Sequence, residues 1–260
     1  MDISSIIEEL ANSDSKFVSV IGAGISKASG MPTFRGEDGL WNNYRAEELA
    51  TPFAFRKDPK TVWEWYRARM RILLEAEPNP AHYALTDLEK EGLSIGIITQ
   101  NVDGLHEIAN SKNIIEVHGR IRYARCTVCD YLERWDTKEK AMKETELPLC
   151  PKCLKNLLRP DVVWFGETLA SDNWNKAVEW SLTSDAMLVI GTSGVVVPIA
   201  SLPVFAKQNG VKIIEFNIEE TPITSISDIS IFGPCEKTLP KFVQELIKRK
   251  RENENVKREY

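Results

Sequence analysis

The stretch FVSVIGAGIS, residues 17–26, is an almost continuously apolar run that ends in a turn with two glycines. Three further runs have the same character, namely IGIIT (95–99), MLVIG (187–191) and KIIEF (212–216). Strands that are covered on both faces have this composition, which is typical of parallel sheets. Longer segments with helical periodicity separate the runs. The chain therefore predicts an α/β fold with a doubly wound, Rossmann-like parallel sheet.

The same reasoning assigns the individual elements. The predicted strands are Lys16–Ile21, Ser94–Thr99, Ile114–Val117, Ala186–Ile190, Val211–Phe216 and Ile229–Phe232. The predicted helices are Ile3–Ala11, Pro59–Ala76, Ala81–Glu89, Asn173–Leu182, Ile199–Gln208 and Thr238–Arg249.

Two insertions interrupt this alternation and predict a smaller second lobe. Residues 31–79 contain an irregular loop and a long aromatic-rich helix, and residues 120–159 contain four cysteines. We expect residues 1–30, 80–119 and 160–250 to form the main domain. Residues 251–260 have no apolar period and are expected to be a solvated tail, at the frayed end of the last helix.

The four cysteines form two C-x2-C pairs separated by twenty residues: Cys126, Cys129, Cys150 and Cys153. This spacing is typical of a tetrahedral thiolate zinc site on a small ribbon. A redox pair is the alternative, but a loop-rich segment with Pro148 and Pro151 favours metal. Four thiolates leave no open coordination position, so such a zinc is structural.

The composition describes an ordinary globular protein, with 260 residues, 43% hydrophobic and 27% charged. A net charge of −5 argues against broad, non-specific nucleic-acid binding. No apolar run approaches the ~20 residues that a membrane-spanning helix needs. The N-terminal residues lack a basic region, so we expect no secretion signal. With five cysteines, four of them predicted metal ligands, disulfides are not expected, and a reducing cytoplasmic location fits.

The glycine turn after the first strand is a candidate nucleotide site. Gly22 and Gly24 would let a phosphate approach the backbone at the start of a helix. However, Lys27 occupies the position of the third glycine of GxGxxG, and no acidic residue ends a second strand ~20 residues on. The motif alone leaves a structural turn and a nucleotide site both open, and it disfavours an ordinary dehydrogenase.

Polar residues follow the carboxyl ends of several predicted strands, and these ends line one crevice of a parallel sheet. Each residue alone could be a cap or a loop residue, but together they predict a ligand site at this edge. They are Gln100, Asn101, Asp103, His118, Gly119, Gly191, Thr192, Ser193 and Asn217. His118 is one of only three histidines and is the candidate for proton transfer near neutral pH. His82 and His106 lie in helical patterns and are expected to be structural.

Several motifs occur in a characteristic order: GAGIS (22–26), GMPTFRG (30–36), TQNVDGLH (99–106), VHG (117–119), the four cysteines, RPDVVWFGE (159–167), GTS (191–193) and Asn217. Together they resemble the sirtuin family of NAD-dependent protein lysine deacylases, over nearly the whole chain. The departures are Met31, where isoleucine is commoner, and Asn110, where glycine is usual. Neither position carries chemistry.

The resemblance implies NAD as cofactor and one structural zinc ion. By similarity, the first glycine turn and the GTS motif hold the phosphates, Asn217 and Glu219 bind the adenosine ribose, and Asn101 and Asp103 line the nicotinamide pocket. The full set of implied NAD-binding residues is Gly22, Ala23, Gly24, Ser26, Thr33, Phe34, Arg35, Trp41, Gln100, Asn101, Val102, Asp103, Gly191, Thr192, Ser193, Asn217, Ile218, Glu219 and Cys235.

The implied reaction removes acyl groups from lysine and releases nicotinamide and O-acyl-ADP-ribose, with His118 and Asn101 as catalytic residues. The acyl oxygen attacks the ribose C1′, and His118 acts as general base on a ribose hydroxyl. The substrate is expected to lie extended, paired by β-augmentation between VVWFGE and GVVV. The implied substrate-binding residues are Ala50, Tyr66, Arg69, Val163, Phe165, Gly166, Glu167, Gly194, Val195 and Val196.

Tyr66 and Arg69 stand at i and i+3 of one predicted helix, where a surface pair is the simpler interpretation. Their spacing matches the Tyr-x-x-Arg pair with which some sirtuins, prokaryotic ones among them, bind an acyl carboxylate, and Ala50 matches the small residue beside it. A guanidinium fork and a phenol suit a carboxylate. We therefore expect succinyl- or malonyl-lysine to be accepted as well as acetyl-lysine.

Three other functions compete with deacylation. Mono-ADP-ribosyl transfer to protein would use the same NAD site. A zinc-ribbon adaptor for nucleic acid is disfavoured by the acidic charge, and a dehydrogenase by the glycine spacing. We expect a monomer that binds acylated lysine in extended protein segments, with no membrane partner and no direct nucleic-acid contact, even where its targets are chromatin or DNA-binding proteins.

Overall fold

The computed structural model describes residues 2–12, 15–32, 40–41, 44–142 and 146–258. Its centre is a sheet with the strand order β11-β10-β9-β1-β4-β5, and every pairing in it is parallel. The strands are β1 (Phe17–Ile21), β4 (Ser94–Thr99), β5 (Ile114–Glu116), β9 (Ala186–Ile190), β10 (Lys212–Asn217) and β11 (Ile229–Phe232). The predicted α/β fold with a doubly wound sheet is confirmed.

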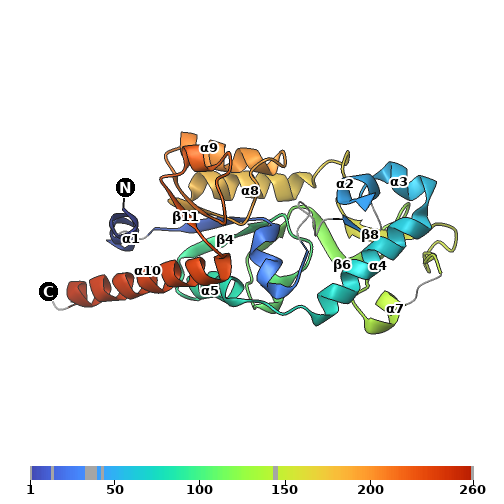
Figure 1. The fold of residues 1–260 in the computed structure, drawn as a ribbon, viewed down its shortest axis with the longest axis horizontal. Coiled ribbons are helices and arrows are strands. Elements are labelled where there is room, and N and C mark those ends of the chain that lie inside the picture. Colours follow the sequence, from blue (N-terminus) through green and yellow to red (C-terminus); the bar gives the residue numbers. More distant parts are fainter. Residues whose placement is uncertain (1, 13–14, 33–39, 42–43, 143–145, 259–260) are drawn as a thin grey trace.

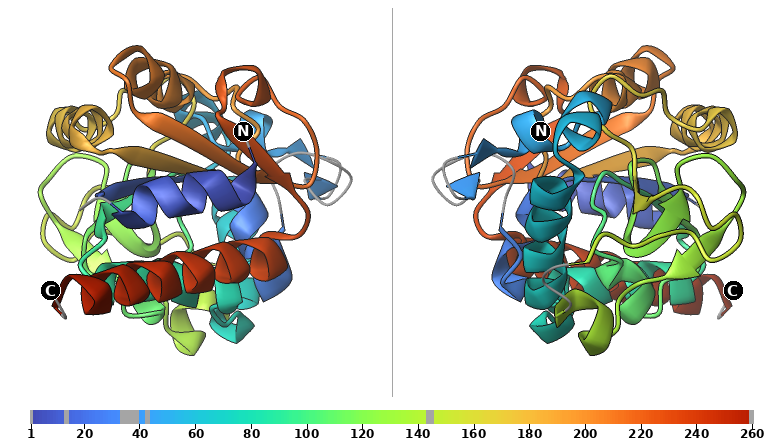
Figure 2. Two further views of the ribbon diagram at one scale, coloured as in Figure 1. Left: turned by 90° about the vertical axis from the view of Figure 1, so that its left-hand side faces the viewer. Right: turned by 90° about the vertical axis from the view of Figure 1, so that its right-hand side faces the viewer.

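Helices cover both faces of this sheet (Figures 1 and 2). Successive residues of β1 point to opposite faces, so Phe17 and Ile21 belong to one hydrophobic cluster and Val18 and Val20 to another. The first cluster is closed by α1 (Ile3–Asn12), α5 (Pro80–Lys90) and α10 (Cys235–Arg258), and the second by α8 (Ser171–Thr183) and α9 (Leu202–Gln208). Burial on both faces explains why the strands are almost continuously apolar.

Two predicted helices differ from those observed. The segment 199–208 is split into a short 3-10 turn, η3 (Ile199–Ser201), and α9, which has a proline in its first turn. The last helix begins at Cys235 and continues to Arg258, through the segment that we expected to be frayed. Arg251 pairs with Glu91, the residue directly after α5, which gives this exposed helical end a partner.

The second lobe, at the right in Figure 1, is built around a hydrophobic cluster of its own. Its helices are α2 (Ala46–Leu49), α3 (Pro52–Lys57), α4 (Pro59–Glu75) and α7 (Lys138–Met142). An antiparallel sheet in the order β7-β6-β8 completes it, with β6 (Gly119–Cys126), β7 (Leu132–Arg134) and β8 (Leu158–Val162). The remaining elements are α6 (Leu105–Ile108), β2 (Leu40–Trp41), β3 (Tyr44–Arg45) and the 3-10 turns η1 (Ala23–Ser29) and η4 (Thr224–Ile226). Among the described helices, none combines the length and the apolar composition that a membrane crossing requires.

Candidate active site

A cleft of about 1230 Å³ lies where the carboxyl ends of β1, β4, β9 and β10 meet residues of the second lobe. Gly22, Gln100, Gly191 and Asn217, each at the end of one of these strands, all line it. A crevice at this edge is where open parallel sheets bind ligands. The structure therefore brings together the strand-end residues that the sequence singled out.

The glycines at the edge allow two turns to approach each other closely. A Cβ atom on Gly22 would lie 2.6 Å from the carbonyl oxygen of Gly191, and one on Gly24 would lie 2.8 Å from the Cα atom of Gly191. No side chain fits at either position, since real Cβ contacts are longer. Gly22 and Gly24 are therefore required, before any ligand is considered, because η1 packs closely against the end of β9.

A buried network joins η1 to the loop after β4. Asn101 Nδ2 donates to Gly22 O at 3.2 Å and to Ser26 Oγ at 3.1 Å. Ser26 Oγ donates to Asp103 Oδ2 at 2.8 Å, and Asp103 Oδ1 accepts from the backbone N–H of Leu105 at 3.0 Å. Beside this network is a small cavity of about 20 Å³, with polar walls from Ser26, Asn101 and Asp103.

His118 lines the large cleft just past the end of β5. Its Nδ1 lies 3.1 Å from the backbone carbonyl oxygen of Gln100. Because a carbonyl only accepts, Nδ1 carries the proton and Nε2 is left with its lone pair. Burial lowers the pKa of His118, and the bond to Gln100 opposes this shift. The ring is therefore neutral near pH 7, as a general base must be.

His82 lies closer to the network than its helical pattern suggested. Its Nδ1 accepts from the backbone N–H of Asn79, and its Nε2 lies 3.5 Å from Ser26 Oγ. Burial lowers its pKa to about 4, and the charge of Asp103 opposes that shift. The contact joins residues 56 positions apart, so no local sequence signal could have found it.

His106 packs against His82, with ring centroids 4.9 Å apart and the ring planes tilted by 53°. It is buried, and neither of its ring nitrogens has a hydrogen-bond partner among the described residues. Burial lowers its pKa well below the usual value, and His82 adds to the effect. This side chain has the structural environment predicted for it.

The far end of the cleft is formed by the ends of β9 and β10. Gln100 Nε2 donates to Thr192 Oγ1 at 3.1 Å, and Asn217 Nδ2 donates to Thr192 O at 2.8 Å. Cys235 also lines the cleft, where burial raises the pKa of its thiol to about 11. A thiol that stays protonated is unreactive.

On the side of the second lobe, Tyr66 and Arg69 of α4 both line the cleft and are buried. The pair is therefore not on the exposed surface. Trp164 Nε1 donates to the phenol oxygen of Tyr66 at 2.8 Å. Ala50 lies on the same wall, and its carbonyl oxygen accepts from the backbone N–H of Phe165 at 2.9 Å.

The four cysteine sulfurs lie within 4.8 Å of one another. Two of the separations are 3.8 Å, between Cys126 and Cys153, and 3.6 Å, between Cys129 and Cys150. A tetrahedral zinc with Zn–S bonds of about 2.3 Å requires sulfurs about 3.8 Å apart. The donor set and its spacing thus fit a structural zinc, and the cysteines do not line the cleft.

Most of the predicted NAD- and substrate-binding residues line one of the two cavities. Gly194 and Val195 are the described exceptions, since neither cavity wall contains them. Thr33, Phe34 and Arg35 lie outside the described residues, and so does the side chain of Trp41. Sequence reasoning missed further lining residues of the large cleft, among them Lys27, Trp65, Trp174, Asn175, Thr221 and Glu236.

Comparison with known proteins places this site in a family. The Sir2 family profile matches residues 22–198. The NAD-dependent protein deacylase of Pyrococcus furiosus is 50% identical over 242 residues, which cover 92% of this chain and 96% of that protein. The NAD-dependent protein deacylase 1 of Archaeoglobus fulgidus is 49% identical over 236 residues, 90% of this chain and 95% of that protein.

The solved structures agree. The crystal structure of a Sir2 homologue–NAD complex superposes with a TM-score of 0.89 at 47% identity, covering 96% of this chain and 95% of that one. A Sir2 complex with a deacetylated p53 peptide and 3′-O-acetyl ADP-ribose superposes with a TM-score of 0.83 at 32% identity, covering 95% and 98%. This chain therefore belongs to the Sir2 family.

Proposed function

We propose that this chain removes acyl groups from protein lysine side chains, consuming NAD and releasing nicotinamide and O-acyl-ADP-ribose. The observation that carries the proposal is His118, whose neutral ring lines a cleft between the glycine turn and the Val163–Glu167 segment. With Nδ1 held by a carbonyl, Nε2 is the nitrogen that can take a proton in the cleft. The names of the relatives support the same reaction.

The residues of the cleft fit NAD. Its volume, about 1230 Å³, exceeds the range of about 300–1,000 Å³ typical of small-molecule pockets, so a dinucleotide and a lysine side chain can share it. Bound there, NAD supplies a ribose carbon with a cationic leaving group. The backbone of Ala23 and Gly24, with Thr192 and Ser193, would hold the phosphates.

The remaining contacts to NAD are assigned by position. Asn217 and Glu219 would bind the adenosine ribose, with Ile218 and the backbone of Cys235 beside the adenine. The small polar cavity suits the nicotinamide carboxamide, with Asn101 and Asp103 as its partners. The four cysteines would hold one zinc ion, which keeps the second lobe folded and takes no part in the chemistry.

The acyl group would enter the wall formed by Ala50, Tyr66 and Arg69. Arg69 lines both cavities, so its guanidinium lies near the junction of the acyl and nicotinamide sites. The guanidinium of Arg69 and the phenol of Tyr66 are hydrogen-bond donors that suit a carboxylate, so this wall favours acyl groups that carry one. We propose that succinyl- and malonyl-lysine are substrates besides acetyl-lysine.

The protein substrate would bind as an extended segment beside residues 163–167. The N–H groups of Val163 and Phe165 already donate to His118 O and Ala50 O, so a substrate strand would pair with the other backbone groups there. We propose a monomeric enzyme in the cytoplasm, which the free cysteines favour.

The test is a panel of acetyl, malonyl and succinyl peptides incubated with NAD. We expect nicotinamide, deacylated peptide and O-acyl-ADP-ribose in equal amounts, detected by mass spectrometry. With His118→Ala we expect no deacylated peptide and no O-acyl-ADP-ribose, and nicotinamide at no more than one molecule per enzyme, because nicotinamide leaves before the step that needs the base. ADP-ribose attached to protein without release of free lysine would instead establish the transferase alternative and overturn the proposal.

A further inference from the structure

The loop that carries Asn101 and Asp103 is held in place by β6. The backbone N–H of Ile121 donates to Val102 O at 3.0 Å, and Arg122 Nε donates to Asp103 O at 2.8 Å. The latter bond is buried. Strand β6 then continues to the metal-ligand residue Cys126. One strand of the zinc-binding lobe thus touches the loop beside the small cavity.

A glycine in the loop, Gly104, leaves room for the side chain of Arg122. Gly104 has φ +70°, a conformation that favours glycine, and a Cβ atom there would lie 2.8 Å from Arg122 Nε. Any other residue at position 104 would push the guanidinium away from Asp103 O. The arginine and the glycine therefore form a complementary pair.

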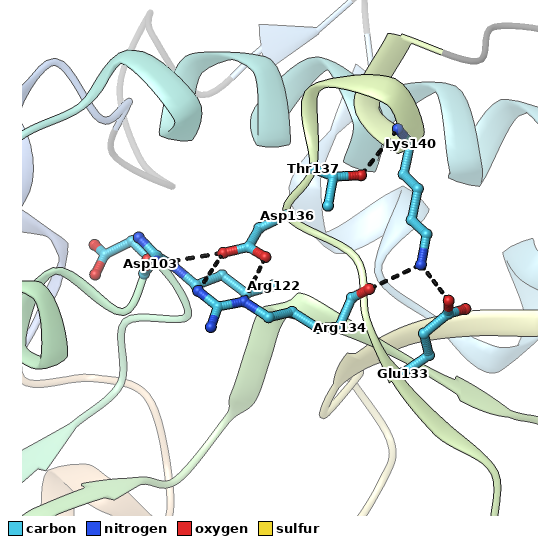
Figure 3. A network of polar contacts seen from close by, with 7 residues as sticks. All are labelled: Asp103, Arg122, Glu133, Arg134, Asp136, Thr137 and Lys140. Atoms are coloured by element: carbon cyan, nitrogen blue, oxygen red, sulfur yellow. Dashed lines mark hydrogen bonds and ion pairs between the residues drawn. The ribbon is translucent and has the colours of Figure 1, made fainter.

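The charge of Arg122 is balanced on the side of the second lobe (Figure 3). Its Nη1 lies 3.5 Å from Asp136 Oδ2, and Arg134 donates to both oxygens of Asp136 at 2.7 and 2.9 Å. Lys140 of α7 donates to Arg134 O and pairs with Glu133. With 8% of its surface exposed, Arg122 needs such a counter-ion, because a buried unpaired charge is strongly unfavourable.

The position of the Asp103 backbone matters because its carboxylate is part of the polar network. The two carboxylate oxygens accept from Ser26 Oγ and from the N–H of Leu105. If Asp103 O lost its donor, it would be an unsatisfied buried acceptor, and the loop would shift to find another. The carboxylate would shift with it.

We propose that Arg122 is a positioning residue for the nicotinamide site, and that its Nε–H bond to Asp103 O aligns the loop on the zinc-binding lobe. This inference rests on the assignment of the small cavity to nicotinamide. Arg122 lines neither the large cleft nor the small cavity, so it would act on the bound cofactor through Asp103 and Asn101. We therefore expect substitution of Arg122 to weaken the binding of NAD and nicotinamide and to leave the binding of the acyl peptide unchanged.

Three substitutions separate the hydrogen bond from the charge. Arg122→Gln has an amide N–H at the same distance along the side chain as Nε, but no charge to pair with Asp136. Arg122→Lys keeps the charge near Asp136 but has a methylene in place of Nε. Arg122→Met has neither. Arg125→Met is the matched control, since Arg125 is on the same strand and pairs with Asp161 instead.

The zinc-loaded full chain is assayed for the KM of NAD, the inhibition constant of nicotinamide and the KM of the acyl peptide, and NAD binding is measured by calorimetry. Arg122→Met and Arg122→Lys should weaken the binding of NAD and of nicotinamide about tenfold, a factor that corresponds to about 1.4 kcal/mol. The KM of the acyl peptide should be unchanged. Arg122→Gln and Arg125→Met should stay close to the wild type.

Two results would overturn the inference. One is wild-type binding of NAD and nicotinamide by Arg122→Lys together with weakened binding by Arg122→Gln. That result would mean that the ion pair with Asp136, and not the hydrogen bond to Asp103 O, positions the loop. The other is a rise of the KM of NAD, the inhibition constant of nicotinamide and the KM of the peptide by similar factors, together with a lower midpoint of thermal unfolding. That result would mean that Arg122 only stabilises the fold. If Arg122→Met does not fold, the glutamine and lysine variants decide by the same criteria. A wild type that binds NAD but releases no nicotinamide would instead refute the proposed function, and calorimetry would still compare the variants.

Discussion

At the scale of single residues, the neutral state of His118 sets the working pH. Its pKa is lowered by burial from 6.5, so the neutral base persists at more acidic pH than a free imidazole would. We expect the acid limb of the kcat/KM profile to have its midpoint below pH 6.5. Measurement of kcat/KM against pH checks this. A midpoint at or above 6.5 would mean that another group limits the rate.

Arg69 provides the second prediction for a single residue. Arg69→Met removes a buried guanidinium from the wall of the cleft but keeps an unbranched, flexible side chain there. We expect kcat/KM for succinyl peptide to fall by about 100-fold and that for acetyl peptide by about threefold at most, because only the first offers a carboxylate. Arg71→Met, a change on the same helix that removes a donor to Ala141 O, should leave the ratio unchanged. An unaltered ratio in Arg69→Met would contradict the acyl assignment.

At the scale of the elements, the buried histidines of α5 and α6 predict acid sensitivity. The folded pKa values of His82 and His106 lie below 6.5, so the unfolded chain binds protons first as the pH falls. Stability is therefore full above about pH 6.5 and is lost toward pH 4, by up to about 1.4 kcal/mol per pH unit for each histidine. Thermal unfolding at pH 7 and pH 5 measures this loss. Between these two pH values, the midpoint of His106→Leu should fall by less than that of the wild type.

Tyr83→Leu is the control for this comparison, because Tyr83 is an exposed residue of α5 next to His82. It should reproduce the pH dependence of the wild type. If His106→Leu shows the same loss as well, the acid sensitivity comes from other groups.

Elements with strong local patterns could be predicted from the sequence. The strands β4, β9 and β11 have the predicted bounds, since continuous apolar runs between turns have few alternative readings. The antiparallel strands of the second lobe were not identified. In β6 the sequence GRIRYARC mixes arginines with apolar residues, and its pairing with β8 depends on the tertiary structure.

The same distinction holds within the site. Strand-end residues such as His118 and Asn217 could be found because parallel strands bring their carboxyl ends together whatever the details of packing. His82 and Arg122 could not, because each reaches the site through one side-chain contact that the backbone pattern does not specify. The domain boundaries proposed from the sequence remain a prediction.

At the scale of the whole molecule, the separate hydrophobic clusters predict that zinc stabilises only one lobe. Cys126 and Cys150 belong to the cluster of the second lobe, whereas the parallel sheet is covered by the other two clusters. Releasing the metal with a thiol reagent and a chelator should therefore unfold the cysteine segment and leave the sheet folded. Circular dichroism should show a small loss of signal. Deacylation should cease, because β6 begins at Gly119, directly after His118 of the cleft, and ends at Cys126.

Metal analysis and two variants make this prediction specific. The purified chain should contain about one zinc per molecule, and Cys150→Ser with Cys153→Ser should contain about none. Thermal unfolding of that double variant should show an early transition for the second lobe and a later one for the sheet. Cys235→Ser is the control, since this thiol lies in the cluster of the main sheet, far from the four sulfurs in sequence and outside their group. A double variant that unfolds in one transition at the wild-type midpoint would show that the four sulfurs hold no stabilising metal.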